Sequence, residues 1–329
     1  MNKKNIILGL ILVVLIALAY FYQGPLKNKE EKNNFLADVA MEEVNKMEIT
    51  RNGSSTVLIK EGEAKWKVEG EGDFYIKEDV AGDLEEKMAS LTRATFELIS
   101  TDPEKKSRFR SNEEKGSRVK LYDNGDQVAD FIVGSLDSST LNSTYVSQAG
   151  IDETYSAQNV ELTGLMLRDD WRSKVIFDTA KNRIAQIRFQ YPDREFTVEK
   201  TSTSSSYSDP DLNIEDTESE EQQGPEWQGT IPRNFSVSDD QMNQIADIMS
   251  DLEAVRIPEQ EFEGTGLSEH LIIVEASGAD FSNTLMVGEK DGKQGDRELY
   301  YAKKGSSDNI YLITGEQRDT LNQTIQSLQ

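Results

Sequence analysis

The two halves of the chain carry the same order of apolar and aromatic residues, and this internal repeat constrains the fold more than any other sequence feature. Trp66 aligns with Trp227 at a shift of 161 residues. The same shift aligns a short strand, an apolar helix stripe and the position after that helix, in the pairs Phe74/Phe235, Leu84/Ile245 and Phe96/Ile257. The sequence therefore predicts two copies of one structural unit.

An insertion separates the early part of the second copy from the rest. Ile59 aligns with Val198 at a shift of only 139 residues, so 22 additional residues must lie before Trp227. Residues 201–224 are the low-complexity stretch in that window, and they hold seven acidic residues and no basic one. Such a composition is typical of a solvated, self-repelling segment, so we expect an acidic disordered insertion at about 201–224.

Each copy contains signals for antiparallel strand pairs and for one amphipathic helix. Asn52-Gly53 and Asn124-Gly125 are typical of two-residue hairpin turns. Leu84, Met88 and Leu91 recur at the spacing of a single helical face. We therefore expect an α+β fold, with two tandem repeats of antiparallel sheet, helices on one face, and boundaries at 44–180 and 181–329.

The N-terminal region contains an uncharged apolar run from Ile6 to Tyr22. As a helix, its 17 residues would span about 26 Å, close to the hydrocarbon core of a bilayer. One interpretation is a transmembrane signal anchor over residues 1–22, followed by a stalk over 23–43. The alternative is a signal peptide that is cleaved after Ala19.

The orientation of this anchor follows from its position in the chain. Lys3 and Lys4 precede the run and Lys27, Lys29 and Lys32 follow it, so the basic residues favour neither side strongly. A short tail before a large polar part is the usual arrangement of an export signal. We therefore expect a single-pass protein of the cytoplasmic membrane, with most of the chain extracytoplasmic.

The composition excludes several classes of function. With 60 acidic and 36 basic residues, the net charge is −24, which argues against a nucleic-acid partner. The chain has no cysteine and a single histidine, His270, which argues against thiolate nucleophiles, Cys-ligated metals and His-based triads. Because nucleotide-binding and nucleophile-elbow motifs are also missing, we predict no catalytic residues and no cofactor.

The acidic insertion also suggests a calcium hypothesis. Its oxygen-bearing side chains follow the spacing of positions 1, 3, 5, 7 and 12 in a calcium-binding loop, namely Asp209, Asp211, Asn213, Glu215 and Glu220. However, position 6 is Ile214 where such loops need glycine. The alternative is a plain solvated loop.

The layout resembles an uncharacterised bacterial family of membrane-anchored proteins, described only as a domain of unknown function. The resemblance rests on short motifs spread over the whole chain: the Lys3-Lys4 apolar N-terminus, Trp66-Lys67-Val68, Ile132-Val133-Gly134, Tyr145-Val146 and Leu167-Arg168-Asp169. Members of the family are often encoded beside gliding-motility-type ABC transporter components. The resemblance implies an envelope location and supplies no catalytic residues.

From these features we expect a membrane-anchored extracytoplasmic accessory or binding module that works with a transporter or cell-envelope complex and does not catalyse a reaction. One alternative is a carboxylate-dependent hydrolase of envelope glycans, which needs two converging acids. A second alternative is a purely structural spacer, which would lack a pocket of ligand size.

Overall fold

The computed structural model describes residues 34–70, 72–140, 142–201, 226–269 and 271–329. These residues divide into two compact units. The first comprises the described part of Met1–Ala64 together with Asp79–Asp170, and the second comprises Lys65–Glu78 and Trp171–Gln329. The calcium candidates Asp209 to Glu220 and the predicted anchor at residues 1–22 lie outside the described residues, as does His270.

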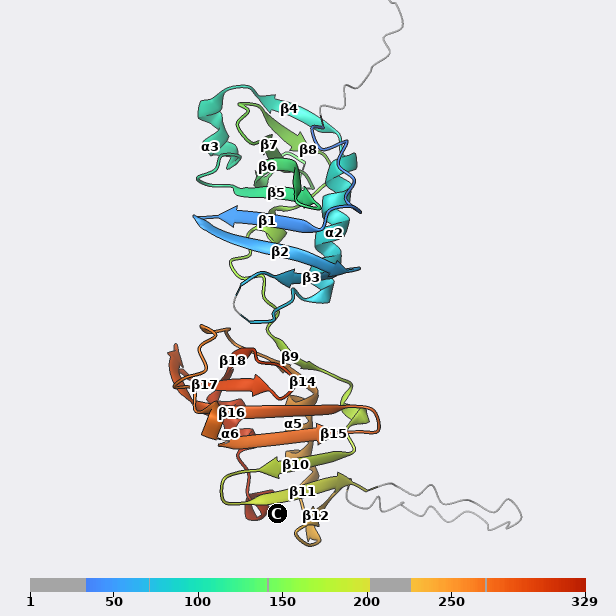
Figure 1. Cartoon of the computed structure of the whole chain (residues 1–329), viewed down its shortest axis with the longest axis vertical. Coiled ribbons are helices and arrows are strands. Elements are labelled where there is room, and N and C mark those ends of the chain that lie inside the picture. The colour runs from blue at the N-terminus through green and yellow to red at the C-terminus, as the bar shows by residue number, and fades with distance from the viewer. Residues whose placement is uncertain (1–33, 71, 141, 202–225, 270) are drawn as a thin grey trace, which may run out of the picture. The chain divides into compact units, whose positions relative to one another are not determined.

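The first sheet has eight antiparallel strands in the order β3-β2-β1-β5-β6-β7-β8-β4 (Figure 1). In chain order these are β1 (Lys46–Arg51), β2 (Ser54–Gly62), β3 (Lys65–Val68), β4 (Phe96–Ser100), β5 (Ser117–Asp123), β6 (Asp126–Leu136), β7 (Thr144–Gln148) and β8 (Thr154–Ala157). Its helices are α2 (Glu78–Arg93), η1 (Pro103–Lys105), α3 (Lys106–Phe109) and α4 (Thr163–Met166). Strand β3 belongs to the segment Lys65–Glu78, which is counted with the second unit.

The second sheet also has eight strands, in the order β13-β12-β11-β10-β15-β16-β17-β18. In chain order these are β10 (Gln186–Gln190), β11 (Glu195–Lys200), β12 (Trp227–Ile231), β13 (Phe235–Ser236), β15 (Ile272–Ser277), β16 (Ser282–Gln294), β17 (Arg297–Lys304) and β18 (Ile310–Thr314). A separate ribbon pairs β9 (Val175–Asp178) with β14 (Asp251–Glu253). The helices are η2 (Lys181–Arg183), α5 (Asp239–Ser250), η3 (Leu267–Glu269), α6 (Gly315–Leu321) and α7 (Ile325–Leu328).

The two sheets share one strand order. Strands β3-β2-β1-β5-β6-β7-β8 of the first correspond one by one to β12-β11-β10-β15-β16-β17-β18 of the second. Trp66 on β3 and Trp227 on β12 are both fully buried. The expected two antiparallel sheets are confirmed, and the structure has few helices beside them.

The hairpin register corrects one detail of the sequence alignment. Met47 pairs with Leu58 in the first unit, and Ile187 pairs with Val198 in the second. Val198 therefore corresponds to Leu58, with a shift of 140 residues, whereas the alignment paired it with Ile59. The error is one residue, but it matters because a one-residue slip moves every side chain of a strand to the opposite face.

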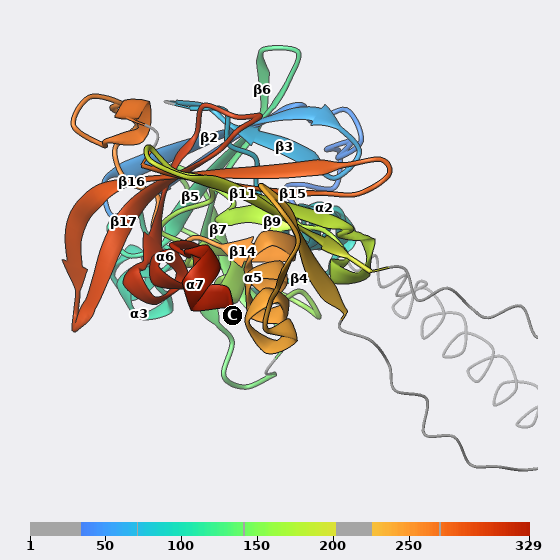
Figure 2. The same cartoon turned by 90° about the horizontal axis from the view of Figure 1, so that it is seen from below.

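Each unit has a helix whose apolar stripe is buried. Ala81, Leu84, Met88 and Leu91 form the buried side of α2. In the second unit, Met242, Ile245, Ala246 and Met249 of α5 belong to one core with the inward residues of the sheet. Figure 2 shows α6 and α7 beside α5, where the backbone amide of Ser238 donates to the carbonyl oxygen of Leu328. Burial of these stripes is the main stabilising contribution of the helices.

Residues 34–43 are packed within the first unit, although the sequence interpretation assigned them to a stalk. The Asn34 amide donates to the carbonyl oxygens of Leu91, Thr92 and Ala94 at 2.9–3.0 Å. Leu36 is 1% exposed, and the Phe35 ring meets the Phe96 ring edge-on. The sequence did not indicate this because Phe35, Leu36, Val39 and Met41 extend over too few positions to show a helical or strand period.

No helix among the described residues is long and apolar enough to cross a membrane.

Candidate functional site

A basic stretch of the first unit surrounds a small cavity. Residues 105–118 contain six basic side chains and two acidic ones in a chain whose net charge is −24. The stretch begins where Asp102 caps η1 by accepting the Glu104 amide, continues through α3, and leads into β5. Its local positive charge contrasts with the acidic character of the whole sequence and makes it a candidate for recognising negatively charged groups.

Arg110 ends α3 in a left-handed backbone conformation, with φ of 56°. This conformation costs a non-glycine residue about 1 kcal/mol or more. It is held because the chain passes directly over β6, where a Cβ atom added to Gly134 would come closer than 3.0 Å to the carbonyl oxygen of Phe109. Packing of loop against strand thus fixes the direction in which the Arg110 side chain leaves the backbone.

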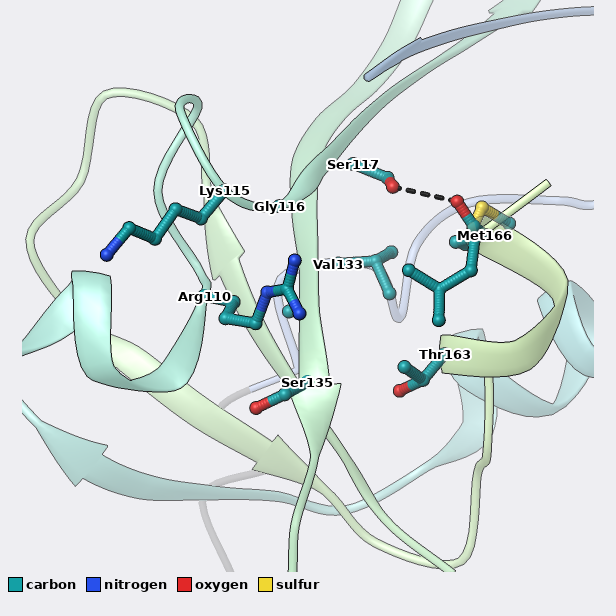
Figure 3. A pocket seen from close by; sticks show the side chains of 10 residues that line it. Arg110, Lys115, Gly116, Ser117, Val133, Ser135, Thr163 and Met166 are labelled. Carbon is teal, nitrogen blue, oxygen red and sulfur yellow. Dashed lines mark hydrogen bonds between the residues drawn. The ribbon is translucent and has the colours of Figure 1, made fainter. Parts of the chain in front are cut away.

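The cavity beside Arg110 has a volume of about 20 Å³, which is room for a water-sized group. Figure 3 shows the Arg110 guanidinium directed into the space between Val133, Ser135 and Thr163, while the Lys115 side chain points away. The Lys115 ammonium instead donates to the Ser107 hydroxyl at 2.7 Å. The remaining lining residues are Gly116, Ser117, Gly134, Met166 and Leu167.

Two of the three side-chain hydroxyls that line the cavity already donate hydrogen bonds to backbone carbonyls. Ser117 donates to the carbonyl oxygen of Met166 at 2.9 Å, the dashed line in Figure 3, and Ser135 donates to that of Phe109 at 3.2 Å. The hydroxyl oxygen of Thr163 is buried and has no hydrogen-bond partner in the described part of the chain. A buried polar atom without a partner is uncommon and calls for a ligand or a water.

Arg110 is also without a charge partner. Among the residues that the structure describes, no acidic side chain forms an ion pair with its guanidinium, whereas nearby Arg118 binds both Glu113 and Asp130 at 2.8 Å. Arg110 is exposed, so a solute can reach it. The cavity therefore combines an unpaired cation with an unpaired hydroxyl.

A second arginine holds the wall of the cavity formed by α4. Arg51 donates to the carbonyl oxygen of Leu167 at 2.6 Å and to the Asp169 carboxylate at 2.8 Å. These bonds satisfy a carbonyl at the end of α4, a short helix whose N-cap, Leu162, offers no side-chain bond. The Leu167-Arg168-Asp169 motif thus has a structural role, because its first and third residues accept hydrogen bonds from Arg51.

The second unit lacks both features at the corresponding place. A Cβ atom on Gly288 would clash with the carbonyl oxygen of Thr265, so Gly266, with φ of 69°, corresponds to Arg110. After the last strand, Thr314 caps α6 by accepting the Gln317 amide at 3.1 Å, whereas Thr163 of the similar Thr-Gly sequence makes no such bond. At this place, the unpaired cation and the unpaired hydroxyl occur in the first unit and not in the second.

Asp137, at the end of β6, forms a buried polar network. It accepts hydrogen bonds from the Ser139 amide and hydroxyl, from Ser156 at 2.7 Å and from Tyr145 at 3.0 Å. Burial raises the pKa of this carboxyl, but the bonds from Ser139, Ser156 and Tyr145 outweigh burial and lower the pKa to about 2. Asp137 is therefore ionised at neutral pH and organises the loop before β7.

Three carboxylates line a larger hollow of about 290 Å³. Asp38 and Glu43 come from the N-terminal turns and Asp123 comes from β5, next to the apolar Phe35, Val39, Ala40 and Val128. No group of three or more His, Cys, Asp or Glu side chains in the described part of the chain is placed to hold a metal ion. The hollow brings together carboxylates, which the predicted alternative of a carboxylate-dependent hydrolase requires.

The edge of the first sheet is open at β4. This strand pairs with β8 on one side, and on the other side no strand partner exists among the described residues. Leu98 and Ile99 on β4 are 46% and 37% exposed. Exposed strand edges with apolar side chains are typical sites of strand addition by another chain.

In the second sheet, β18 corresponds to β8, and residues 255–260 lie along β18 as β4 lies along β8. The Gln260 side chain accepts from the Ile310 amide at 2.8 Å and donates to the Ile310 carbonyl at 3.1 Å. Val255 and Arg256 form backbone bonds with Leu312, and the adjoining strand β14 pairs with β9. Residues 255–260 are therefore the counterpart of β4, but they form one isolated bridge where β4 forms a regular strand.

The aligned Trp66 and Trp227 both lie in the core, but sequence reasoning did not single out Arg110, Thr163, Asp137 or β4. The density of basic residues between 105 and 118 was a signal that could have indicated Arg110. No signal marked Thr163, because its unpaired state follows from tertiary packing.

Comparison with known proteins adds a family match. A family model described as a domain of unknown function (DUF4340) matches residues 81–223. This span includes α3, the Arg110 cavity, Asp137 and β4. No curated protein and no solved structure matches the chain.

Proposed function

We propose that the protein is a membrane-anchored extracytoplasmic binding module that works with a transporter or cell-envelope complex and has no catalytic activity of its own. The anchor is the apolar run from Ile6 to Tyr22. The transporter association rests on the resemblance to a family that is often encoded beside ABC transporter components. The shared strand order of the two sheets supports an origin by duplication of one unit.

The observation that carries the proposal is the open edge at β4. An added strand would satisfy the outward backbone groups of β4 and cover Leu98 and Ile99. In the second unit the counterpart of β4, residues 255–260, forms one isolated bridge and no regular strand, so this unit would then serve as a support. Only the first unit would thus bind the added strand, although the two sheets share one strand order.

The test is co-purification of partners from detergent-solubilised membranes. A tagged full-length chain should recover a defined set of envelope proteins, and Leu98→Lys with Ile99→Lys should reduce their recovery at least fivefold. The matched control is Ile231→Lys, a substitution of a similarly exposed aliphatic residue on β12. Recovery of background proteins alone, or equal recovery with the β4 and control variants, would overturn the proposal.

The second candidate is a hydrolase of envelope glycans, favoured by the acid-lined hollow of Asp38, Glu43 and Asp123. It predicts release of sugar fragments from purified cell-wall glycan by the full-length chain. It also predicts that Asp123→Asn abolishes this release. An unchanged rate in that variant would leave the hollow without a catalytic role.

A further inference from the structure

We propose that the cavity beside Arg110 binds a carboxylate group. This inference goes beyond the proposed function and does not depend on it, since the cavity and the β4 edge are built from different residues. The argument starts from two groups that the fold leaves without partners, the Arg110 guanidinium and the Thr163 hydroxyl.

The hydrogen-bond donors at the cavity fit the two oxygens of a carboxylate better than the four oxygens of a phosphate. The guanidinium offers a planar fork of N–H donors that fits a carboxylate in a bidentate manner, and the Thr163 hydroxyl adds one further donor. Ser117 and Ser135 already donate to backbone carbonyls, so they are not free to bind additional oxygens. A phosphate group, with more oxygens and charge, would lack donors here.

The size and the apolar part of the cavity lead to the same choice. A volume of about 20 Å³ has room for one carboxylate oxygen, and Val133, Met166 and Leu167 offer contact surface to the carbon that carries the carboxylate. The net charge of −24 disfavours the binding of extended polyanions. A single carboxylate, presented by a small acid or by the end of a polypeptide, meets these limits.

Backbone strain and local comparison support a role in binding. Arg110 keeps a left-handed conformation that the second unit assigns to Gly266, so the arginine is retained at a position where glycine is less strained. Thr163 lacks the capping role that Thr314 has. Arg110 and Thr163, the two residues that differ from the second unit in this way, both line the cavity and both supply hydrogen-bond donors to it.

The test is NMR of the full-length chain in detergent, labelled with ¹⁵N-arginine. The Nε–H signal of Arg110, identified by its loss in Arg110→Gln, should shift saturably with sodium acetate, at concentrations in the millimolar range, and not with sodium chloride at equal ionic strength. Thr163→Val should weaken acetate binding at least threefold. The matched control, Arg108→Gln, removes an exposed charge of the same stretch outside the cavity and should leave the titration unchanged.

Titrations with N-acetylalanine and with inorganic phosphate complete the experiment. N-acetylalanine distinguishes the sources: a shift with it and with acetate indicates the end of a polypeptide, and a shift with acetate alone indicates a small free acid. Inorganic phosphate binding more tightly than acetate would overturn the assignment to carboxylates. Absence of a saturable shift with acetate would mean that the cavity holds only water, and would overturn the site altogether.

Discussion

Gly134 on β6 lies so close to Phe109 that a Cβ atom added to the glycine would come within 3.0 Å of the carbonyl oxygen of Phe109. Gly288 on β16 has the same relationship to Thr265 in the second unit. The chain that crosses each sheet at this point can approach the strand only where there is no side chain. In the first unit, this approach also sets the position of Arg110.

Gly134→Ala should therefore destabilise the protein by about 2 kcal/mol, because backbone atoms have to move apart. Gly288→Ala should have a similar effect for the same reason. The control is Gly82→Ala in α2, where an added Cβ meets nothing within 4 Å, and which should raise stability by about 1 kcal/mol. Urea unfolding followed by circular dichroism measures all three. Equal stability of the Gly134 and Gly82 variants would contradict the close approach.

Asp137 should make the stability of the protein depend on pH in acid. Its folded-state pKa of about 2 lies below the ordinary 3.8, so the ionised form favours folding. The stabilisation is fully present above about pH 4 and is lost as the pH falls through about 2. The difference corresponds to about 2 kcal/mol, and unfolding at pH 7, 4 and 2 measures it.

The matching variants are Asp137→Asn, which removes the charge, and Asp126→Asn at an exposed position of β6. Asp137→Asn should be less stable than the parent at pH 7 and should approach it at pH 2. Asp126→Asn should follow the parent at every pH. A parent and an Asp137→Asn variant that differ equally at pH 7 and pH 2 would show that the carboxylate charge is irrelevant.

Replacing residues 202–225 by Asn-Gly should leave the fold intact. Lys200 and Trp227 are register partners, and the Thr201 amide donates to the carbonyl oxygen of Glu226 at 2.9 Å, so the ends of the replaced segment are already adjacent. A two-residue turn can close this hairpin. We expect a Tm within about 3 °C of the parent. A loss of cooperative melting would contradict it.

The same variant tests the calcium hypothesis, because it lacks Asp209, Asp211, Asn213, Glu215 and Glu220. If these residues bind calcium, millimolar CaCl₂ raises the Tm of the parent and not that of the variant. An equal response of both chains to calcium would assign any effect to other residues.

The absence of cysteine allows a direct test of membrane topology. Ser54→Cys introduces a single thiol at an exposed position of the β1–β2 hairpin. In intact cells, a membrane-impermeant maleimide should label Ser54→Cys, whereas Asn2→Cys should be labelled only after permeabilisation. Labelling in the opposite pattern would place the bulk of the chain in the cytoplasm. The mass of the purified chain shows whether cleavage after Ala19 has occurred.

Part of the architecture was accessible from the sequence because it depends on local signals. Asn52 and Gly53 both have positive φ, as the predicted hairpin turn requires, and Asn124 and Gly125 repeat this. The stripe of Leu84, Met88 and Leu91 lies in the core as expected. Local turn chemistry and helical periodicity are encoded in neighbouring residues, so they can be recognised without knowledge of the rest of the chain.

The candidate sites depended on contacts between distant residues. Arg110, Ser135 and Thr163 share a cavity only because loop, strand and short helix meet there. β4 lies along β8 as a regular strand, whereas its counterpart, residues 255–260, contacts β18 through one bridge and through the Gln260 side chain. The one-residue error at Ile59 has the same origin, since register is set by pairing across strands.

The sequence by itself thus determined the two antiparallel sheets, their turns and the buried helical stripes, because hydrophobic period and turn residues act over a few positions. Tertiary structure alone decided which polar groups remain without partners and which strand edge stays open. The physical reason is that satisfaction of hydrogen bonds and charges is a property of the packed whole, in which each group finds or lacks a partner far away in the chain.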